Sequence, residues 1–498
     1  MPANKSILLL IADDLGREQL GCYGCKALET PPLSKLASSG VTFDMAFTST
    51  ASCSGSRTVI NTGLHTHQNG SYGLTHGRNG FQTLPDIETA PSLFNKLGYK
   101  TGIIGKVHVG PDHLYPWQHR QESESRDVAW VADQVDSFFS AAKEEQKPFY
   151  LTVGFVDPHR CSKRGGFGND PACPDPRIKD CEIRPEDVTV PDYLSDIPEV
   201  RQELTEYYRA INRLDQGIGL ILESLERQGL ADDTLVLFLS DNGPPFVNSK
   251  TTLYEAGVRL PFIMRAPCSD STAKVGILNP NMVSYVDILP TFLDWAGHTG
   301  LASEKNKKKR KGRSVLPILN HTERQAGWEF VFGSHTFHEI TAYWPTRYMR
   351  TPRLKYHRNV AWRLNFPVAM DLYASKSFEG MRNSGKNSKD HPAMIGPRRL
   401  KDYIRRPAEE LFDLDNDPLE LCNLAALPMY ADQLLWMRTQ LEAWQRESED
   451  LWLWKDGVAI IRYFDSGYAR EGLCVPDRFD FDADEPSTDA APAVKLLT

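Results

Sequence analysis

Short apolar runs alternate with amphipathic stretches along the first 300 residues of the chain. The runs are rich in Leu, Ile, Val and Phe, which is typical of buried strands. The stretches repeat apolar residues every three or four positions, which is typical of helices that pack on one face. The expected strands are 7–12, 101–104, 149–155, 235–239 and 262–264, and the expected helices are 33–38, 90–97, 128–142, 200–227 and 285–296.

This alternation predicts an α/β fold, with a large mixed, mostly parallel sheet sandwiched by helices. Beyond about residue 330 the pattern changes to short strand-like pieces followed by one amphipathic helix around 434–444. A chain of 498 residues is too long for one ordinary core. We therefore expect a catalytic domain over 1–328 and a smaller C-terminal α+β domain over 329–498, with a short antiparallel sheet that contributes to the substrate pocket.

The charge and composition narrow the range of partners. The formal net charge is −8, so no general basic field attracts nucleic acid, and no apolar run is long enough to span a membrane. The basic run 305–313 fits a solvated surface loop, a nuclear address or a polyanion contact. We expect neither nucleic-acid nor membrane partners, and a cytoplasmic location if Met1 is the native start. A lysosomal or secreted location is expected if a leader has been removed.

Two acidic pairs follow directly after expected strands. Asp13 and Asp14 come after 7–12, and Asp241 and Asn242 come after 235–240. Either pair alone would fit a helix cap or a turn. Because the carboxyl ends of parallel strands meet at one edge of a sheet, the two pairs together favour a metal site. Three carboxylates and an amide oxygen suit Ca²⁺, with Mg²⁺ as the alternative.

A cysteine stands at the expected start of a helix. Cys53 has a serine on each side and is followed by Arg57. A helix N-terminus attracts anions, and the arginine adds to that attraction. These residues alone leave open whether Cys53 is a thiolate nucleophile or a buried structural thiol.

The segment Cys53-Ser54-Gly55-Ser56-Arg57 resembles the signature of the sulfatases, members of the alkaline phosphatase superfamily. In that signature the cysteine is oxidised to formylglycine, and a proline or alanine usually stands where this chain has Gly55. Further segments resemble sulfatase motifs in the family's order: 12–14, 102–108, 240–243, 250 with 255–261, and 410–424. The chain is thus identified as similar to sulfatases over most of its length.

The resemblance implies a role for each matching residue. Formylglycine at residue 53, made by a formylglycine-generating enzyme and hydrated, would attack sulfur. Calcium would be held by Asp13, Asp14, Asp241 and Asn242, and Asp241 would take the proton of the attacking hydroxyl. Arg57 and Lys106 would hold the hydrate, and His108 would deprotonate its second hydroxyl. His159 and Lys250 would contact the sulfate and protonate the leaving group.

Several segments resemble sulfatases that act on the N-sulfate of a sugar: 102–110, 157–161, 213–217 and 332–339. They imply a small sulfated sugar as substrate, with Asp157, Arg160, His338 and Glu339 in its pocket, and a linked pair between Cys161 and Cys173. Lys250 and the block 255–259 instead resemble sulfatases in general. The expected substrate is therefore an N-sulfate (sulfamate) or an O-sulfate ester, and a homodimer is a further possibility.

Two other functions stay open. An aryl or alkyl sulfatase, or a phosphonate or phosphodiester hydrolase of the same superfamily, would use the same metal, nucleophile and cations. A catalytically silent binder of sulfated ligands would result if Cys53 remains a thiol. The histidines His65, His67 and His76 near the signature are expected to be structural.

Overall fold

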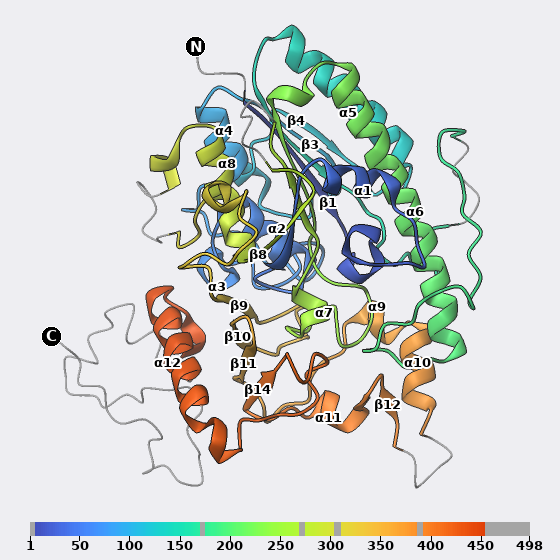
Figure 1. The fold of residues 1–498 in the computed structure, drawn as a ribbon, viewed down its shortest axis with the longest axis vertical. Coiled ribbons are helices and arrows are strands. Elements are labelled where there is room, and N and C mark those ends of the chain that lie inside the picture. Colours follow the sequence, from blue (N-terminus) through green and yellow to red (C-terminus); the bar gives the residue numbers. More distant parts are fainter. Residues whose placement is uncertain (1–4, 170–174, 268–273, 303–309, 386–391, 454–498) are drawn as a thin grey trace, which may run out of the picture.

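The computed structural model describes residues 5–169, 175–267, 274–302, 310–385 and 392–453 (Figure 1). The expected partner of Cys161, Cys173, lies outside the described residues. Among the residues described, no helix combines the length and the apolar character needed to cross a membrane.

A large mixed sheet organises the first 300 residues. Its strand order is β4-β3-β5-β1-β6-β7-β2-β8. Every neighbouring pair is parallel except the two pairs that β7 makes with β6 and β2, so the predicted mostly parallel sheet is confirmed. The strands are β1 (Ser6–Ala12), β2 (Val41–Phe47), β3 (Lys100–Gly105), β4 (His119–Glu122), β5 (Phe149–Gly154), β6 (Thr234–Ser240), β7 (Phe262–Arg265) and β8 (Ile277–Ser284).

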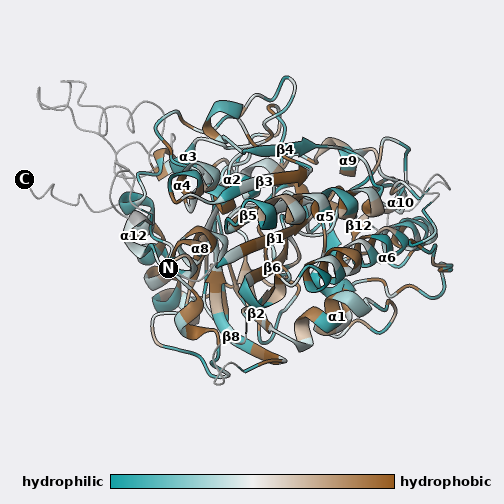
Figure 2. Cartoon of the chain, turned by 90° about the horizontal axis from the view of Figure 1, so that it is seen from above, coloured by the Kyte–Doolittle hydropathy of each residue, from teal (hydrophilic) through white to brown (hydrophobic). Residues whose placement is uncertain are grey.

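Helices cover both faces of this sheet, because its central strands are apolar on both sides. Leu8 and Leu10 of β1 pack in the core under α1, α5 and α6, whereas Ile7 and Leu9 pack in the core under α2, α4 and α8. Figure 2 shows the apolar central strands between more polar helices. The helices are α1 (Pro31–Ser38), α2 (Cys53–Thr62), α3 (Thr66–Asn69), α4 (Ala90–Lys96), α5 (Val128–Glu144), α6 (Pro198–Arg227), α7 (Glu255–Val258) and α8 (Ile288–Trp295).

The C-terminal part is built on a smaller antiparallel sheet, which confirms that part of the predicted fold class. Its order is β14-β11-β10-β9, and the long helix α12 (Ala431–Glu447) packs against it, as Figure 1 shows. The strands are β9 (Val331–His335), β10 (Thr346–Arg350), β11 (Leu354–Asn359) and β14 (Glu409–Asp413). The remaining elements are α9 (Met370–Tyr373), α10 (Lys376–Asn383), β12 (Met394–Ile395), β13 (Arg398–Arg399) and α11 (Leu400–Ile404).

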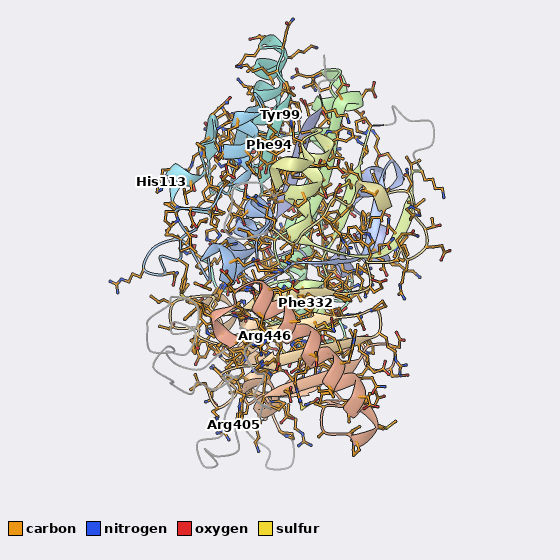
Figure 3. All side chains as sticks on the ribbon, turned by 90° about the vertical axis from the view of Figure 1, so that its left-hand side faces the viewer. Phe94, Tyr99, His113, Phe332, Arg405 and Arg446 are labelled. Carbon is orange, nitrogen blue, oxygen red and sulfur yellow. The ribbon has the colours of Figure 1, made fainter. Side chains whose placement is uncertain are left out.

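The two sheets share a small apolar core. Phe47 of β2 and Leu253 belong to the same buried cluster as Val331 of β9 and Tyr348 of β10. In Figure 3 the side chains fill the space between the upper and lower parts, with Phe332 close to the junction. The boundary at 328 remains a prediction, but the contact explains how loops of both parts reach one site.

Candidate active site

The two predicted metal-binding pairs lie side by side at the carboxyl edge of the large sheet. Strands β1 and β6 pair in parallel with Ala12 opposite Ser240, so the residues that follow leave the sheet together. The amide of Asp14 donates to Oδ1 of Asp241 at 3.2 Å, and Nδ2 of Asn242 donates to Oδ1 of Asp14 at 2.6 Å. All four side chains of the pairs are buried.

Helix α6 fixes the turn after β1. Asp14 has a left-handed backbone with φ of 66°, which non-glycine residues adopt rarely outside constrained sites. The hydroxyl of Tyr207, on α6, donates to the carbonyl of Asp14 at 2.7 Å and accepts from the amide of Gly16 at 3.1 Å. The carboxylate of Asp14 is therefore held over the sheet edge.

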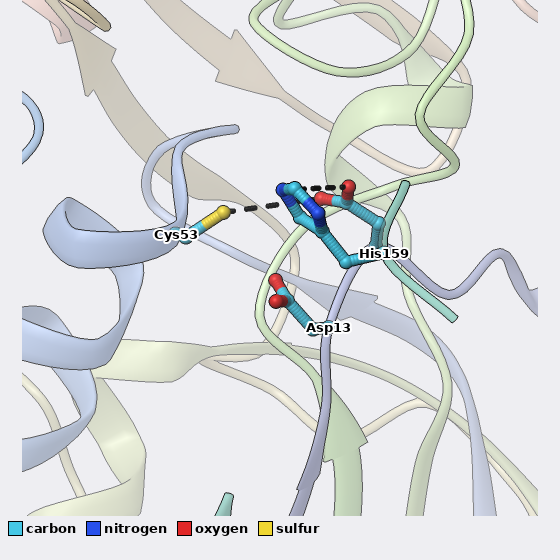
Figure 4. A group of neighbouring side chains, drawn as sticks. Asp13, Cys53 and His159 are labelled. Carbon is cyan, nitrogen blue, oxygen red and sulfur yellow. Dashed lines mark hydrogen bonds and ion pairs between the residues drawn. The ribbon is translucent and has the colours of Figure 1, made fainter. Parts of the chain in front are cut away.

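The donor set fits a divalent cation. Asp13 Oδ1 and Asn242 Oδ1 are buried and receive no hydrogen bond from any residue that the structure describes. Ligand atoms of Asp13, Asp14, Cys53 and His159 all lie within 4.8 Å of one another, and Figure 4 shows Asp13, Cys53 and His159 pointing toward one another. Buried oxygens without partners are costly unless a cation or water satisfies them, and hard oxygen donors suit Ca²⁺ or Mg²⁺.

Cys53 is the first residue of α2 and faces this cluster. Its side chain is 1% exposed, and Sγ lies 3.9 Å from Oδ1 of Asp14. Burial, and then the negative charge of Asp13, raise the pKa of the thiol well above its usual range. This environment favours the protonated thiol, which is a poorer nucleophile than a thiolate.

Gly55 occupies a crowded position on α2. A Cβ atom there would lie 3.0 Å from Cγ2 of Thr50 and 3.3 Å from Cγ2 of Thr66. The glycine therefore matches close packing around the first turn of the helix, and a larger residue would need its neighbours to move by a few tenths of an ångström.

Two cations connect the helix to the oxygen cluster. Nε of Arg57 pairs with Oδ2 of Asp241 at 2.8 Å, and Nζ of Lys106 pairs with Oδ2 of Asp13. Burial raises the pKa of Asp13, but the charges of four neighbours outweigh burial and hold this pKa well below its usual range. The four neighbours are Lys106, His159, Arg57 and Lys250. The side chain of Asp13 is therefore an ionised carboxylate, the form that binds a cation.

A pair of glycines places Lys106 at the end of β3. Gly105 and Gly154 lie opposite each other in the parallel β3–β5 ladder, and the amide of Lys106 donates to the carbonyl of Gly154 at 2.6 Å. A Cβ on Gly105 would lie 2.1 Å from the carbonyl oxygen of Gly154, and Gly105 has φ of 86°. Only glycine permits this approach, which brings the lysine back over the site.

Lys250 uses all three of its N–H donors at the site. Nζ lies 2.9 Å from Oδ2 of Asp14, 2.7 Å from Oδ2 of Asp371 and 3.1 Å from Nε2 of His159. Burial alone would lower the pKa of Lys250, but the carboxylates of Asp14 and Asp371 raise this pKa well above its usual range. The ammonium therefore stays charged beside the histidine.

The tautomer of His159 follows from its other contact. Nδ1 lies 2.6 Å from the carbonyl oxygen of Arg160. A carbonyl only accepts, so Nδ1 carries the proton and Nε2 presents its lone pair to Lys250. Burial, and then the charge of Lys250, lower the pKa of His159, which keeps the ring neutral.

Asp371 is a site residue that the sequence did not reveal. It stands on the short helix α9 of the C-terminal part, with a side chain that is 18% exposed. Its pKa is held well below the usual range: burial opposes this, but the charge of Lys250 outweighs it. No motif surrounds Asp371, so only the three-dimensional fold could place it here.

His108 meets a second histidine that was expected to be structural. Nε2 of His108 lies 2.6 Å from Nδ1 of His76, and the two rings stack with their centroids 4.8 Å apart. Nδ1 of His108 is buried and has no partner among the described residues. Burial, and then the charges of Lys106 and Arg57, lower the pKa of His108 well below its usual range. His108 is therefore a neutral ring at neutral pH.

Asp157 and Arg160 form ion pairs on either side of His159. Oδ1 of Asp157 accepts from Arg126 at 2.6 Å and Oδ2 from Arg213 at 2.7 Å, and the side chain is 1% exposed. Arg160 pairs with the buried Glu203 at 2.7 Å. These ion pairs hold the loop of His159, and contact of either residue with a sugar stays a prediction.

His338 and Glu339 come from the C-terminal part, in the loop after β9. Nδ1 of His338 is 2.8 Å from Oγ of Ser52, the residue before Cys53. Oε1 of Glu339, whose side chain is 20% exposed, accepts from the amide of Met370 at 2.8 Å and so tethers the helix that carries Asp371. His338 is buried, whereas the carboxylate of Glu339 is reachable by a ligand.

His65 and His67 are structural, as expected. Their rings lie parallel, and both meet the edge of Trp444 on α12 with centroids 4.9 and 5.1 Å away. His65 also contacts Ser49 at 2.6 Å. These histidines connect the segment after α2 to α12 through Trp444.

The chain is similar to known sulfatases along most of its length. The family model described as Sulfatase matches residues 5–298. The N-sulphoglucosamine sulphohydrolase of Homo sapiens is 36% identical over 477 residues, which cover 91% of this chain and 92% of that protein. An ulvan-active sulfatase of Formosa agariphila is 28% identical over 446 residues, covering 87% of this chain and 80% of that protein.

The fold is shared with solved structures as well. One of them, in complex with its substrate D-glucosamine-2-N,6-O-disulfate, superposes with a TM-score of 0.63 at 19% identity, over 90% of this chain and 98% of that chain. At that identity the likeness concerns the fold alone. The family match over residues 5–298 and the 36% identity along nearly the whole chain carry the stronger conclusion: this protein belongs to the sulfatase family and is a sulfuric ester hydrolase.

Proposed function

We propose that the protein hydrolyses the N-sulfate of a glucosamine-type sugar, using formylglycine derived from Cys53 and a bound Ca²⁺. The single observation that carries this proposal is the meeting of Cys53, at the N-terminus of α2, with a cluster of buried oxygens that lack partners among the described residues. The choice of an N-sulfate is supported by the 36% identity to the human N-sulphoglucosamine sulphohydrolase.

The residues around Cys53 provide a binding site for a sulfate group. The first amides of α2 and the ammonium groups of Lys106 and Lys250 concentrate positive charge at one point. Such preorganised groups stabilise the oxygen charge that grows during sulfuryl transfer. A Ca²⁺ ion bound by Asp13, Asp14, Asp241 and Asn242 supplies Lewis-acid polarisation of a sulfate oxygen. Conversion of Cys53 to hydrated formylglycine supplies a hydroxyl nucleophile that the buried thiol cannot match.

His159 and Lys250 form the acid side of the site. The ammonium of Lys250 donates to Nε2 of His159 at 3.1 Å, so the histidine orients the lysine, and the lysine holds the proton that the pair can give to a leaving nitrogen. A leaving amine or alkoxide needs that proton because it is otherwise a strong base. Asp371 holds the lysine in this position at 2.7 Å.

His108 forms the base side. Its ring is neutral at neutral pH, and Nδ1 carries no contact to another described residue. That nitrogen is free to take a proton from residue 53 when sulfate departs. The acid and the base therefore stand on different loops, after β5 and after β3, and act at different stages.

The partly exposed carboxylates Glu339 and Asp371 support an amino sugar as the substrate. They come from the C-terminal part, at 20% and 18% side-chain exposure, and one of them contacts Lys250. Carboxylates accept hydrogen bonds from sugar hydroxyls and from the amine that is released. The small sulfated sugar is the proposed ligand. The formylglycine-generating enzyme is the proposed maturation partner, and a homodimer and the cellular location are not needed by the chemistry.

Rates on three substrates test this proposal. Purified protein should show a higher kcat/KM on N-sulfoglucosamine than on 4-nitrophenyl sulfate, and the lowest on phenyl phosphonate. A preference for the phosphonate would instead support a phosphonate hydrolase. A preference for the aryl sulfate would contradict the proposal that a sugar N-sulfate is the substrate. The Cys53→Ala variant is the matched control for contaminating activity.

Mass spectrometry of the peptide that carries residue 53 tests the nucleophile. The proposal expects the mass of the aldehyde or its hydrate in the active fraction. An intact thiol in all molecules, no turnover and retained binding of a sulfated sugar would identify a silent binder. Comparing Gly55→Ala with the natural chain then shows whether the crowded position of Gly55 affects conversion or only packing.

A further inference from the structure

The contact between His108 and His76 links the base side of the site to solvent. His108 follows β3 and is half-buried, with Nδ1 enclosed. His76 is exposed and lies on the loop after α3, beside Gly77. The nitrogen atoms that face each other are 2.6 Å apart. This loop was not assigned to the chemistry by any sequence motif.

A nitrogen–nitrogen contact this short requires one shared proton. Two imidazole nitrogens attract only when one donates an N–H and the other offers its lone pair. Nε2 of His108 is therefore either the donor to Nδ1 of His76 or the acceptor from it. In the first arrangement Nδ1 of His108 is unprotonated and ready to accept, and Nε2 of His76 faces outward.

We propose that His76 is a proton relay for His108, so that the pair of histidines carries the proton released at residue 53 to solvent. This inference rests on the proposed function, because it needs His108 to be the base. His76 would not touch the substrate. It would reset His108 between turnovers and hold its ring in the tautomer that accepts at Nδ1.

The proton transfer balances without any further reagent. Nδ1 of His108 takes a proton from the hydroxyl at residue 53, and the N–H at Nε2 passes its own proton to Nδ1 of His76. The N–H at Nε2 of His76 then releases a proton to water. When water next adds to the aldehyde at residue 53 and loses one proton to solvent, Nδ1 of His108 gives its proton to the carbonyl oxygen. Nε2 of His108 then recovers a proton from Nδ1 of His76, and Nε2 of His76 takes one from water, which restores both rings. One proton enters and one leaves, and no atom changes its oxidation state.

The charges around the pair favour outward movement. His108 is faced by the cations Lys106 and Arg57 and by the carboxylate Asp13. His76 is faced by Lys106 and by the carboxylates Glu124 and Glu339. Lys106 faces both rings, so a proton that leaves the inner ring escapes the charge of Arg57 and exchanges one carboxylate, Asp13, for two, Glu124 and Glu339. This exchange lowers its electrostatic energy.

The kinetic test uses His76→Ala with His113→Gln as the matched control. His113 is also an exposed histidine, on the turn Asp112–Leu114. We expect His76→Ala to lower kcat roughly tenfold or more with little change in KM. Added imidazole should restore kcat in a saturable manner, and His113→Gln should match the natural chain. Unchanged kcat in His76→Ala, or a loss that imidazole does not restore, would overturn the relay.

Nitrogen NMR gives a readout that does not depend on turnover. In metal-free protein carrying Cys53→Ala, the imidazole nitrogens of His108 should change their tautomer ratio when His76→Gln is added, and should not change with His113→Gln. No change in His108 would overturn the relay. If the natural chain hydrolyses no sulfate at all, the proposed function fails. If it does and His76→Ala behaves like it, only the relay fails.

Discussion

Two buried charge clusters in this protein differ in whether their carboxylate oxygens have hydrogen-bond partners. In the C-terminal part, Asp450 accepts from Nε and Nη2 of Arg347 at 2.6 and 2.8 Å, from Gln445 at 2.9 Å and from the amide of Trp452 at 3.1 Å. At the edge of the large sheet, Oδ1 of Asp13 accepts nothing from the described residues. Both carboxylates are 0% exposed.

The difference separates a structural ion pair from a reactive site. A bidentate arginine with two further donors satisfies a carboxylate completely, so it can neither bind a ligand nor exchange a proton. In the cluster around Cys53, Oδ1 of Asp13 and Oδ1 of Asn242 accept no hydrogen bond from the described residues. Buried oxygens of this kind suit a cation, so incomplete hydrogen bonding marks the reactive site.

The largest effect is expected from a substitution that removes the nucleophile from the reactive cluster. Cys53→Ala should lower turnover of a sulfated substrate by about 10⁴-fold or more, because no other group in the site can replace a nucleophile. Its melting temperature should stay close to that of the natural chain, since only one buried sulfur is lost. Substantial residual turnover in the purified variant would contradict the assignment.

The next effect breaks the structural ion pair. Asp450→Ala leaves Arg347 buried without its partner and should lower the free energy of unfolding by about 3–5 kcal/mol in urea denaturation. The control is Asp180→Ala, which removes a partner of Arg209 that is 69% exposed and should cost at most about 1 kcal/mol. Equal losses in the two variants would remove the distinction between buried and exposed pairs.

A smaller effect comes from filling the reactive cluster. Ca²⁺ should stabilise the natural chain by about 2.7 kcal/mol at a hundredfold excess over Kd, and a chelator should reverse this. In Asp13→Asn the calcium-dependent rise in melting temperature should be largely lost. Asp450→Asn, at the saturated cluster, should keep that rise, and an equal loss in both variants would argue against a site at Asp13.

The last prediction concerns the pH dependence of stability. It rests on a third buried carboxyl, which in the described part of the chain neither pairs with an arginine nor lies among other carboxylates. Asp215 on α6 accepts one bond from the amide of Leu33 at 2.9 Å, and burial raises the pKa of its side chain from 3.8 to about 7. The folded protein then keeps a proton that the unfolded chain releases. The stabilisation is complete below about pH 4 and is lost as the pH rises through about 7. Asp215→Asn should flatten this slope in urea titrations between these pH values, whereas an unchanged slope would place its origin elsewhere.

The sequence predicts the central strands well because burial on both faces leaves uninterrupted apolar runs, as in β1 and β6. It does not reveal β2, where Asp44 and Thr42 interrupt the apolar pattern, or the reversed direction of β7, which depends on the connection rather than on composition. Strand β10 likewise has no apolar run, since Arg347 and Arg350 are buried there as ion-pair partners.

The site shows the same division. Residues that directly follow strands or start α2 could be found because motifs carry them along the chain. Asp371 and His76 could not, because each stands alone in a loop or short helix and acquires its neighbours only through folding. For Asp157 and Arg160 the motif gives the position in the sequence, and folding adds the ion-pair partners Arg126 and Glu203, which no sequence pattern indicates.

The burial of α2 has a consequence for the history of each molecule. All ten residues from Cys53 to Thr62 are buried, so a modifying enzyme cannot bind this segment once the chain has folded. The proposed oxidation of residue 53 would therefore have to be completed while the segment is still extended. Under that proposal a molecule that folds first would stay inactive, and the specific activity of a preparation would report the fraction of molecules oxidised before folding.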